Sequence, residues 1–126
     1  IGIHDELLKP GRRTSWPHAE KLEDEFIYVI SGHPDAWIDG KLYRLNPGDG
    51  IGFKAGSGIS HTFINNSDSD VELLTVGDRT MKENKIFYPL HHNRNIELGE
   101  SFWHDHPIRK LGQHHGVPDK SVKLPD

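Results

Sequence analysis

Residues 25–50 read EFIYVISGHPDAWIDGKLYRLNPGDG, and this stretch decides the fold. An apolar run over residues 26–30 is closed by Gly32, and two short strands then flank Asp39-Gly40. Asp-Gly tolerates the positive φ angles of a type I′ turn, whose twist matches that of the strands it joins. Residues 46–49, with Pro and Gly at their centre, mark the next turn. The stretch therefore predicts a strand followed by a tight β-hairpin.

The same alternation of turn residues and short apolar segments runs through the first two-thirds of the chain. Such a rhythm is typical of an all-β sandwich or barrel. No segment before Tyr88 has a sustained helical period with capping residues. The sequence predicts an all-β fold, with further strands over residues 3–8, 50–53, 59–64 and 71–76.

The chain has 126 residues, close to the commonest size of a single domain. Its composition changes near residue 90, after which it is polar and rich in His, Pro and Gly. We expect a barrel over residues 1–90 and an irregular polar tail over residues 91–126. The tail is expected to pack on the barrel or on a partner subunit, with Trp103 as its anchor.

Charge and composition argue against several classes of partner. The formal net charge is −4, and Arg12-Arg13 is too short a basic run for nucleic-acid binding. No apolar stretch is long enough to cross a bilayer, so no membrane association is expected. The absence of cysteine excludes disulfides and thiolate ligands and favours a cytoplasmic location. No nucleophile elbow, P-loop or dinucleotide fingerprint is present.

Four side chains suggest a metal site. His18 and Glu20 stand two residues apart and so share one face of an extended strand. Glu25 begins the apolar run of residues 26–30, and His61 follows a glycine-rich loop. Two imidazoles and two carboxylates from two strands remote in sequence can converge on one divalent ion. Taken singly, each has a plainer interpretation: a surface or core histidine, a solvated strand end, or part of an acidic loop.

The order of these residues resembles the cupin superfamily of small β-barrels. The first cupin motif matches Gly11, His18, Glu25 and Gly32, and the second matches Gly48, Gly56, His61 and Asn65. The resemblance spans roughly residues 3–76. It implies a double-stranded β-helix, or jelly-roll barrel, with a divalent transition metal (Mn, Fe, Zn or Ni) held by His18, Glu20, Glu25 and His61.

The sequence departs from the cupin pattern at informative positions. Glu20 stands where the family usually has a second His, and Lys54 replaces the Pro of the second motif. The ligand set becomes two His and two Glu, which suits Mn²⁺, Fe²⁺ or Zn²⁺. The same change is compatible with a weakened or lost metal site. The histidine pairs beyond residue 90 are expected to lie in the polar tail without forming a metal site.

The resemblance implies several functions, because cupins support many chemistries. The first is a metal-dependent enzyme, such as an isomerase, acting on a sugar or sugar phosphate inside the barrel, with Glu20 as general base. The alternatives are a non-catalytic small-molecule-binding or sensory cupin and an Fe-dependent dioxygenase. The resemblance also implies a homodimer, with residues 3–8 and Phe102-Trp103 as candidate contacts between subunits.

Overall fold

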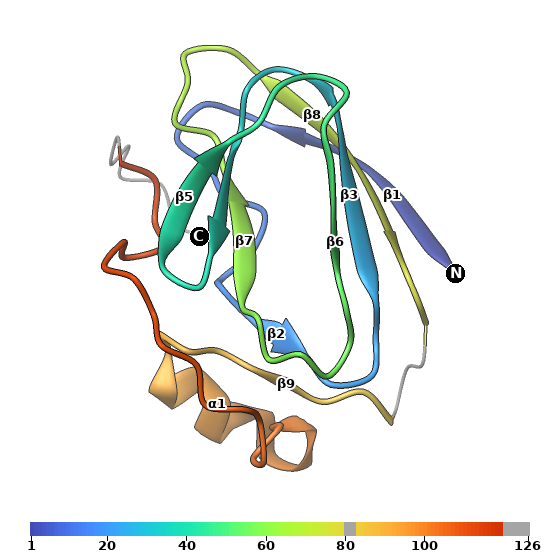
Figure 1. Ribbon diagram of the computed structural model, residues 1–126, viewed down its shortest axis with the longest axis vertical. Coiled ribbons are helices and arrows are strands. Elements are labelled where there is room, and N and C mark those ends of the chain that lie inside the picture. The colour runs from blue at the N-terminus through green and yellow to red at the C-terminus, as the bar shows by residue number, and fades with distance from the viewer. Residues whose placement is uncertain (80–82, 120–126) are drawn as a thin grey trace.

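The strands of this chain form three antiparallel sheets (Figure 1). The computed structural model describes residues 1–79 and 83–119. The elements are β1 (Gly2–Leu8), β2 (Ala19–Glu20), β3 (Glu25–Ser31), β4 (Asp35–Ile38), β5 (Lys41–Arg44), β6 (Gly50–Phe53), β7 (His61–Ile64), β8 (Val71–Gly77), β9 (Ile86–Phe87), α1 (His92–Leu98) and the 3₁₀ turn η2 (Gly99–Ser101). A four-stranded sheet has the order β1-β8-β3-β6, a three-stranded sheet has β5-β4-β7, and β2 pairs with β9. The predicted all-β fold is confirmed, with a single α-helix in the described residues.

The hairpin of β4 and β5 has the turn that its sequence predicts. Asp39 and Gly40 both have positive φ, at 46° and 89°. Trp37 faces Leu42 across the hairpin, and Trp37 also pairs with Thr62 of β7. Strand β7 begins at His61, two residues later than predicted. The reason is Ser60, whose backbone N–H and hydroxyl both donate to the Asp39 carboxylate, at 2.9 and 3.0 Å.

The main core lies between the four-stranded and three-stranded sheets. Inward-facing residues of both sheets fill it: Leu8, Ile27, Val29, Ala36, Phe53, Phe63, Val71 and Leu73. Alternation along β3 explains the arrangement, since Ile27 and Val29 are buried whereas Phe26, Tyr28 and Ile30 are exposed. The hydrophobic effect of this buried surface is the main force that holds the two sheets together.

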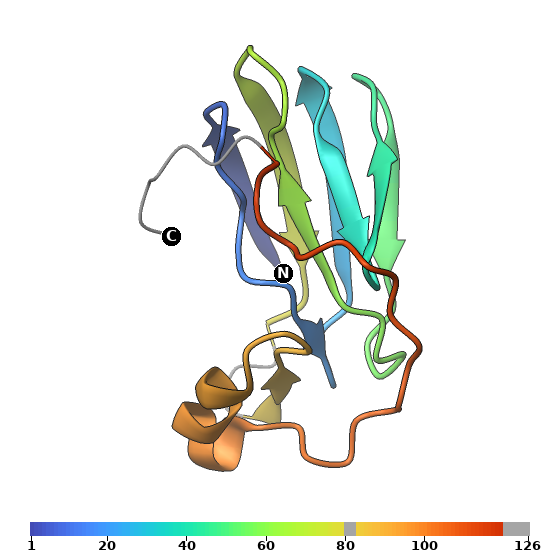
Figure 2. The same ribbon diagram turned by 90° about the vertical axis from the view of Figure 1, so that its left-hand side faces the viewer.

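A second cluster joins the chain beyond residue 85 to the barrel. Trp103 is buried against Ala19 and Phe87, and its backbone N–H donates to the Ile86 carbonyl at 2.8 Å. α1 and β9 lie at the same end of the barrel as β2 (Figures 1 and 2). The α-helix within residues 91–119 was not predicted from the sequence. Of the expected tail, residues 120–126 lie outside the described part of the chain.

The segment after Trp103 returns along the barrel beside the β4–β5 hairpin (Figure 2). Gly112 donates its N–H to the Asp39 carbonyl at 2.7 Å, and His114 donates to the Gly40 carbonyl at 2.9 Å. The Trp37 indole N–H donates to the His114 carbonyl at 3.0 Å. These bonds fix residues 112–114 against the turn of the hairpin.

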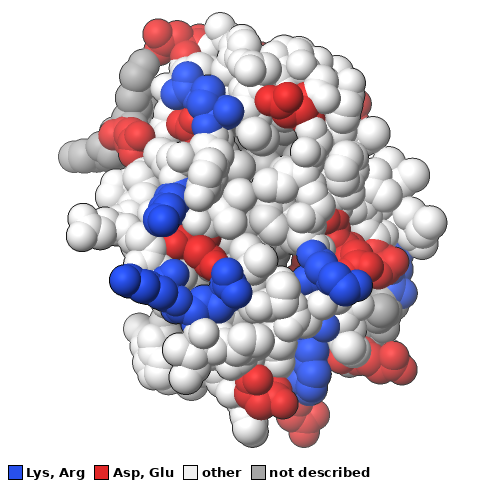
Figure 3. Space-filling view, in the orientation of Figure 1, with Lys and Arg blue, Asp and Glu red and all other residues white. Residues whose placement is uncertain are grey.

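Within the described residues, no helix is long and apolar enough to span a membrane. Basic and acidic side chains lie in adjacent groups on the face shown in Figure 3.

Candidate metal centre

The structure places two of the predicted residues directly opposite each other. His18 and His61 form an antiparallel bridge in which each backbone N–H donates to the other's carbonyl, at 3.2 and 2.9 Å. Side chains of such a pair project to the same side of the sheet. The two imidazole rings accordingly lie 5.0 Å apart, centroid to centroid. The short bridge, and not a long strand, therefore brings these rings together.

The ring of His18 has a defined hydrogen-bonding role. Its Nδ1 lies 2.9 Å from the Trp16 carbonyl oxygen, which can only accept, so Nδ1 carries the proton. In the neutral ring this leaves a lone pair on Nε2, the arrangement found in metal-binding histidines. Burial lowers the pKa of His18 to about 4, and the neighbouring His61 acts in the same direction. His18 is therefore neutral at physiological pH, as a ligand must be.

His61 is paired with the carboxylate of Glu25. Its Nε2 lies 2.7 Å from Glu25 Oε1, and its ring stacks on Phe53 at a centroid separation of 3.7 Å. Burial raises the pKa of Glu25, but the hydrogen bond to His61 and the charges of His61 and His18 outweigh it. The net pKa of Glu25 lies below its ordinary value. Glu25 is thus an ionised carboxylate within reach of an imidazole.

Glu20 comes from the two-residue strand β2. Its Oε2 lies 3.9 Å from His18 Nε2, and its Oε1 accepts a hydrogen bond from the Asn84 amide at 3.1 Å. Burial raises the pKa of Glu20 to about 7, and the negative charges of Glu25 and Glu23 add to this rise. A carboxyl group with such a pKa can take up and release a proton near neutral pH.

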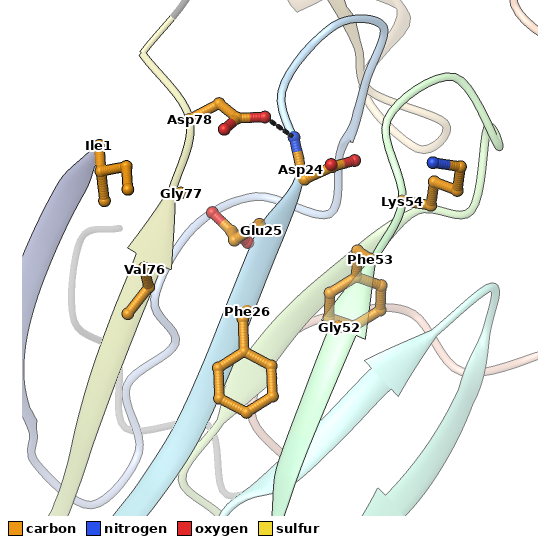
Figure 4. A pocket seen from close by; sticks show the side chains of 10 residues that line it. All are labelled: Ile1, Asp24, Glu25, Phe26, Gly52, Phe53, Lys54, Val76, Gly77 and Asp78. Atoms are coloured by element: carbon orange, nitrogen blue, oxygen red, sulfur yellow. Dashed lines mark hydrogen bonds between the residues drawn. The ribbon is translucent and has the colours of Figure 1, made fainter.

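These four residues line three cavities between them. One of about 120 Å³ is lined by His18, Glu25 and His61, and one of about 440 Å³ is lined by His18 and Glu20. The third, of about 460 Å³, opens at the start of β3 and has Glu25 on its wall (Figure 4). Asp24 lies at its rim, where its N–H donates to Asp78 at 3.2 Å. His18 lines both of the first two cavities and so separates a small inner space from a larger outer one.

Comparison with known proteins agrees with this architecture. The profile of the cupin domain matches residues 4–77, which is more than half of the chain. The chain belongs to the cupin family. No curated protein sequence matches this cupin.

Several solved cupin structures are similar to this one. A sugar phosphate isomerase of the cupin superfamily from Silicibacter pomeroyi is 31% identical, with a TM-score of 0.66 over 69% of this chain and 55% of that one. A proposed sugar phosphate isomerase from Acidithiobacillus ferrooxidans is 28% identical, with a TM-score of 0.69 over 72% and 57%. A proposed oxalate decarboxylase from Thermotoga maritima is 27% identical, with a TM-score of 0.54 over 60% and 63%. The chain thus spans little more than half the length of the first two.

The four predicted residues form two close pairs in this cupin, His18 with Glu20 and His61 with Glu25. Within residues 1–79 and 83–119, the three-residue group whose ligand atoms all lie within 4.8 Å of one another is a different one, in the tail. Two nitrogens and two carboxylates in partly buried positions are nevertheless a donor set suited to a divalent ion. Closing the two pairs onto an ion would require the His61–Glu25 contact to open.

The tail group consists of His114, His115 and Asp119. Nδ1 of His114 accepts the Gly116 N–H at 3.0 Å, and Nδ1 of His115 accepts the Val117 N–H at 3.1 Å. Nε2 of His114 lies 2.7 Å from Asp119 and donates to it. In both rings the lone pair of the neutral form is therefore already engaged on Nδ1, which leaves Nε2 protonated. This bonding pattern stabilises a turn, and an ion there would have to displace the His114–Asp119 bond, as an ion in the barrel would have to open the His61–Glu25 contact.

Three residues near the site were missed by the sequence analysis. Glu6 lines the inner cavity, and burial raises its pKa. Its position was readable from the alternation of β1, where Glu6 shares a face with the buried Leu8. Tyr88 and Arg94 line the outer cavity. No local pattern marks these two, because their placement depends on how the chain beyond β9 packs.

Proposed function

We propose that this cupin domain binds one divalent transition-metal ion through His18, Glu20, Glu25 and His61, and acts there on a small polar molecule such as a sugar or sugar phosphate. The observation that carries the proposal is the hydrogen bond from His18 Nδ1 to the Trp16 carbonyl. It directs the lone pair on Nε2 toward Glu20 and the cavities. The names of the two similar isomerases support the choice of substrate class.

The chemistry follows from the two states of Glu20. In the metal-free protein Glu20 has a pKa of about 7, and it borders the larger cavity. Glu20 serves as the base where His18, Glu25 and His61 hold the ion and its own carboxylate is not a ligand. It then takes a proton from one carbon of a bound substrate and returns it to the adjacent carbon, as an isomerase requires. A bound divalent ion supplies Lewis-acid polarisation of the substrate carbonyl oxygen. Mn²⁺, Fe²⁺, Zn²⁺ and Ni²⁺ all accept this donor set.

The proposal is tested by titrating metal-free protein with Mn²⁺ and Zn²⁺ in a calorimeter. Wild type is expected to bind about one ion per chain, and His61→Ala to lose at least ~100-fold in affinity, more than loss of an outer-shell partner costs. His115→Ala is the matched control, since it removes an imidazole from the tail group, and it should bind as wild type does. Equal binding by wild type and a folded His61→Ala variant would overturn the proposal.

A non-catalytic binding cupin is the second candidate. The observation that favours it is the His61–Glu25 contact of 2.7 Å, which satisfies both groups without an ion. A binding module of this kind would keep its ligand affinity in His61→Ala. The enzyme proposed here would lose its activity in that variant.

A further inference from the structure

Arg94 is the residue by which α1 reaches the outer cavity. The cavity of about 440 Å³ is lined by His18 and Glu20 together with Tyr88 and Arg94. Arg94 is the one Lys or Arg side chain among the described residues that line it. A volume of this size is in the range of small-molecule sites. The cavity therefore has a cationic side chain in the same lining as two of the proposed metal ligands.

Contacts with Trp16, Glu97 and the Tyr88 side chain hold the Arg94 guanidinium in place. Its Cζ lies 5.2 Å from the centroid of the Trp16 ring, and its Nη1 donates to Glu97 at 2.8 Å. The helix turn that carries it is fixed by Asn95, whose side chain accepts the Tyr88 N–H at 2.7 Å and donates to the Tyr88 carbonyl at 2.9 Å. Arg94 thus enters the cavity from a fixed backbone.

A purely structural role for Arg94 is the plainer alternative. An exposed ion pair three residues apart on a helix contributes little to the stability of the helix. Glu97 is 63% exposed and Arg94 is 48% exposed, so water screens their attraction. A guanidinium has five N–H donors, and the bonds to Glu97 and to the Tyr88 side chain leave others for a planar or tetrahedral anion. Replacing Glu97 by the anion of a ligand in the cavity therefore costs little.

We propose that Arg94 binds the phosphate or carboxylate group of a small molecule whose other end reaches His18 and Glu20. This inference rests on the proposed function, because it takes the metal site as the place of the ligand's uncharged oxygens. It makes the segment beyond β9 part of the site. It also gives Glu97 a role as an internal competitor for the guanidinium.

The test uses the three indole N–H signals of the full 126-residue chain in NMR spectra. Metal-free protein is titrated with inorganic phosphate and, separately, with acetate. Trp16 contacts Arg94 and is the reporter, whereas Trp37 and Trp103 are buried elsewhere and are internal controls. Shifts with phosphate but not acetate would assign the anion as a phosphate, and the reverse result would assign a carboxylate.

Arg94→Gln is expected to weaken the anion affinity at least ~10-fold, the usual scale for a lost charge-assisted hydrogen bond. Glu97→Gln should strengthen it at least about twofold, since the competing pair is lost. The matched control is Arg109→Gln, an arginine paired with Asp39 at 2.5 Å and outside the cavity lining, which should bind as wild type does.

Three results would overturn the inference: an unshifted Trp16 signal with both anions at millimolar concentration, equal affinity in Arg94→Gln, or equal loss in Arg109→Gln. Zn²⁺ titration of Arg94→Gln distinguishes a failure of the anion site from a failure of the proposed metal site. If Zn²⁺ binds normally and the anion does not depend on Arg94, only the anion site is wrong. If the anion depends on Arg94 and no metal binds to the wild type, only the metal site is wrong.

Discussion

At the residue scale, His18 and Glu20 respond to burial in opposite ways. Burial disfavours the charged form of each, so it lowers the pKa of His18 and raises that of Glu20. In the metal-free protein, the lowered pKa of His18 makes the free energy of unfolding decrease as pH falls from 6.5, the ordinary pKa of histidine, toward about 4. The raised pKa of Glu20 makes the free energy of unfolding decrease as pH rises from 4.5 to about 7. The two residues thus change the free energy of unfolding in opposite directions with pH, so a comparison of variants is needed to measure the contribution of each.

Glu20→Gln should therefore change how the stability of the metal-free protein depends on pH. The folded-state pKa of Glu20 lies above its unfolded value, so wild type loses up to about 3 kcal/mol between pH ~4.5 and ~7 that the variant keeps. Gln preserves the oxygen that accepts from Asn84. Urea unfolding of both proteins across this range measures the difference. A difference that does not change with pH would show that Glu20 has an ordinary pKa.

At the element scale, the β4–β5 turn and the returning segment approach too closely for side chains. A Cβ added at Gly40 would lie 2.4 Å from the backbone of Gly112, and one at Gly112 would lie 2.6 Å from the Gly40 carbonyl oxygen. Glycine at both positions is what allows the two hydrogen bonds that hold residues 112–114 to the hairpin. The turn therefore has a second role, as a docking point for the chain after η2.

Gly40→Ala and Gly48→Ala form a matched pair that tests this role. Their φ values are 89° and 91°, so both pay the ~1–2 kcal/mol of a left-handed conformation. Nothing lies within 4 Å of a Cβ at Gly48. Gly40→Ala should cost ~1–3 kcal/mol more in unfolding free energy, because its methyl group overlaps Gly112. Equal costs in chemical denaturation would show that the close approach contributes nothing.

The sequence predicts the barrel strands well because their signals are local. The alternation of β3 and the Asp39-Gly40 turn are each readable from neighbouring residues. Strand β9 was not predicted because two residues carry no period, and at β2 the sequence indicated only that His18 and Glu20 share one face of an extended strand. Helix α1 was not predicted because it buries no residue and lacks a side-chain cap. Its position depends on tertiary contacts such as that of Asn95 with Tyr88.

Only part of the candidate site is predictable from the sequence, because only some of its residues belong to a local pattern. His18 and Glu25 belong to a spaced pattern along the sequence, and the structure places both on the inner cavity or beside it. Arg94 belongs to no pattern in the chain. The bond of His18 to Trp16, on which the metal proposal depends, is a local contact between residues two apart, but no sequence pattern indicates the orientation of the ring.

At the scale of the whole molecule, apolar side chains are exposed on the outer face of the four-stranded sheet. Ile3, Val76 and Phe26 lie in one row across β1, β8 and β3. Ile3 is 64% exposed, and β1 is an edge strand of the sheet. Exposed apolar residues on an unpaired edge are typical of surfaces that bind another chain. We therefore keep the expectation of a homodimer, formed through this face.

Light scattering should give twice the chain mass of 14.3 kDa at micromolar concentration. Ile3→Glu should reduce the mass to that of one chain, because the introduced charge would be buried between subunits. Ile108→Glu, at a residue 96% exposed in the tail, is the control and should leave the dimer intact. A wild-type monomer would contradict the expectation.

The central claim is that one ion lies among His18, Glu20, Glu25 and His61. Anomalous diffraction from crystals of the Zn²⁺-loaded protein, recorded at the zinc edge, locates the ion directly. The account predicts a peak between the His18 and His61 rings, with the His61–Glu25 contact opened to admit it. A peak at His114, His115 and Asp119, or none inside the barrel, would contradict it.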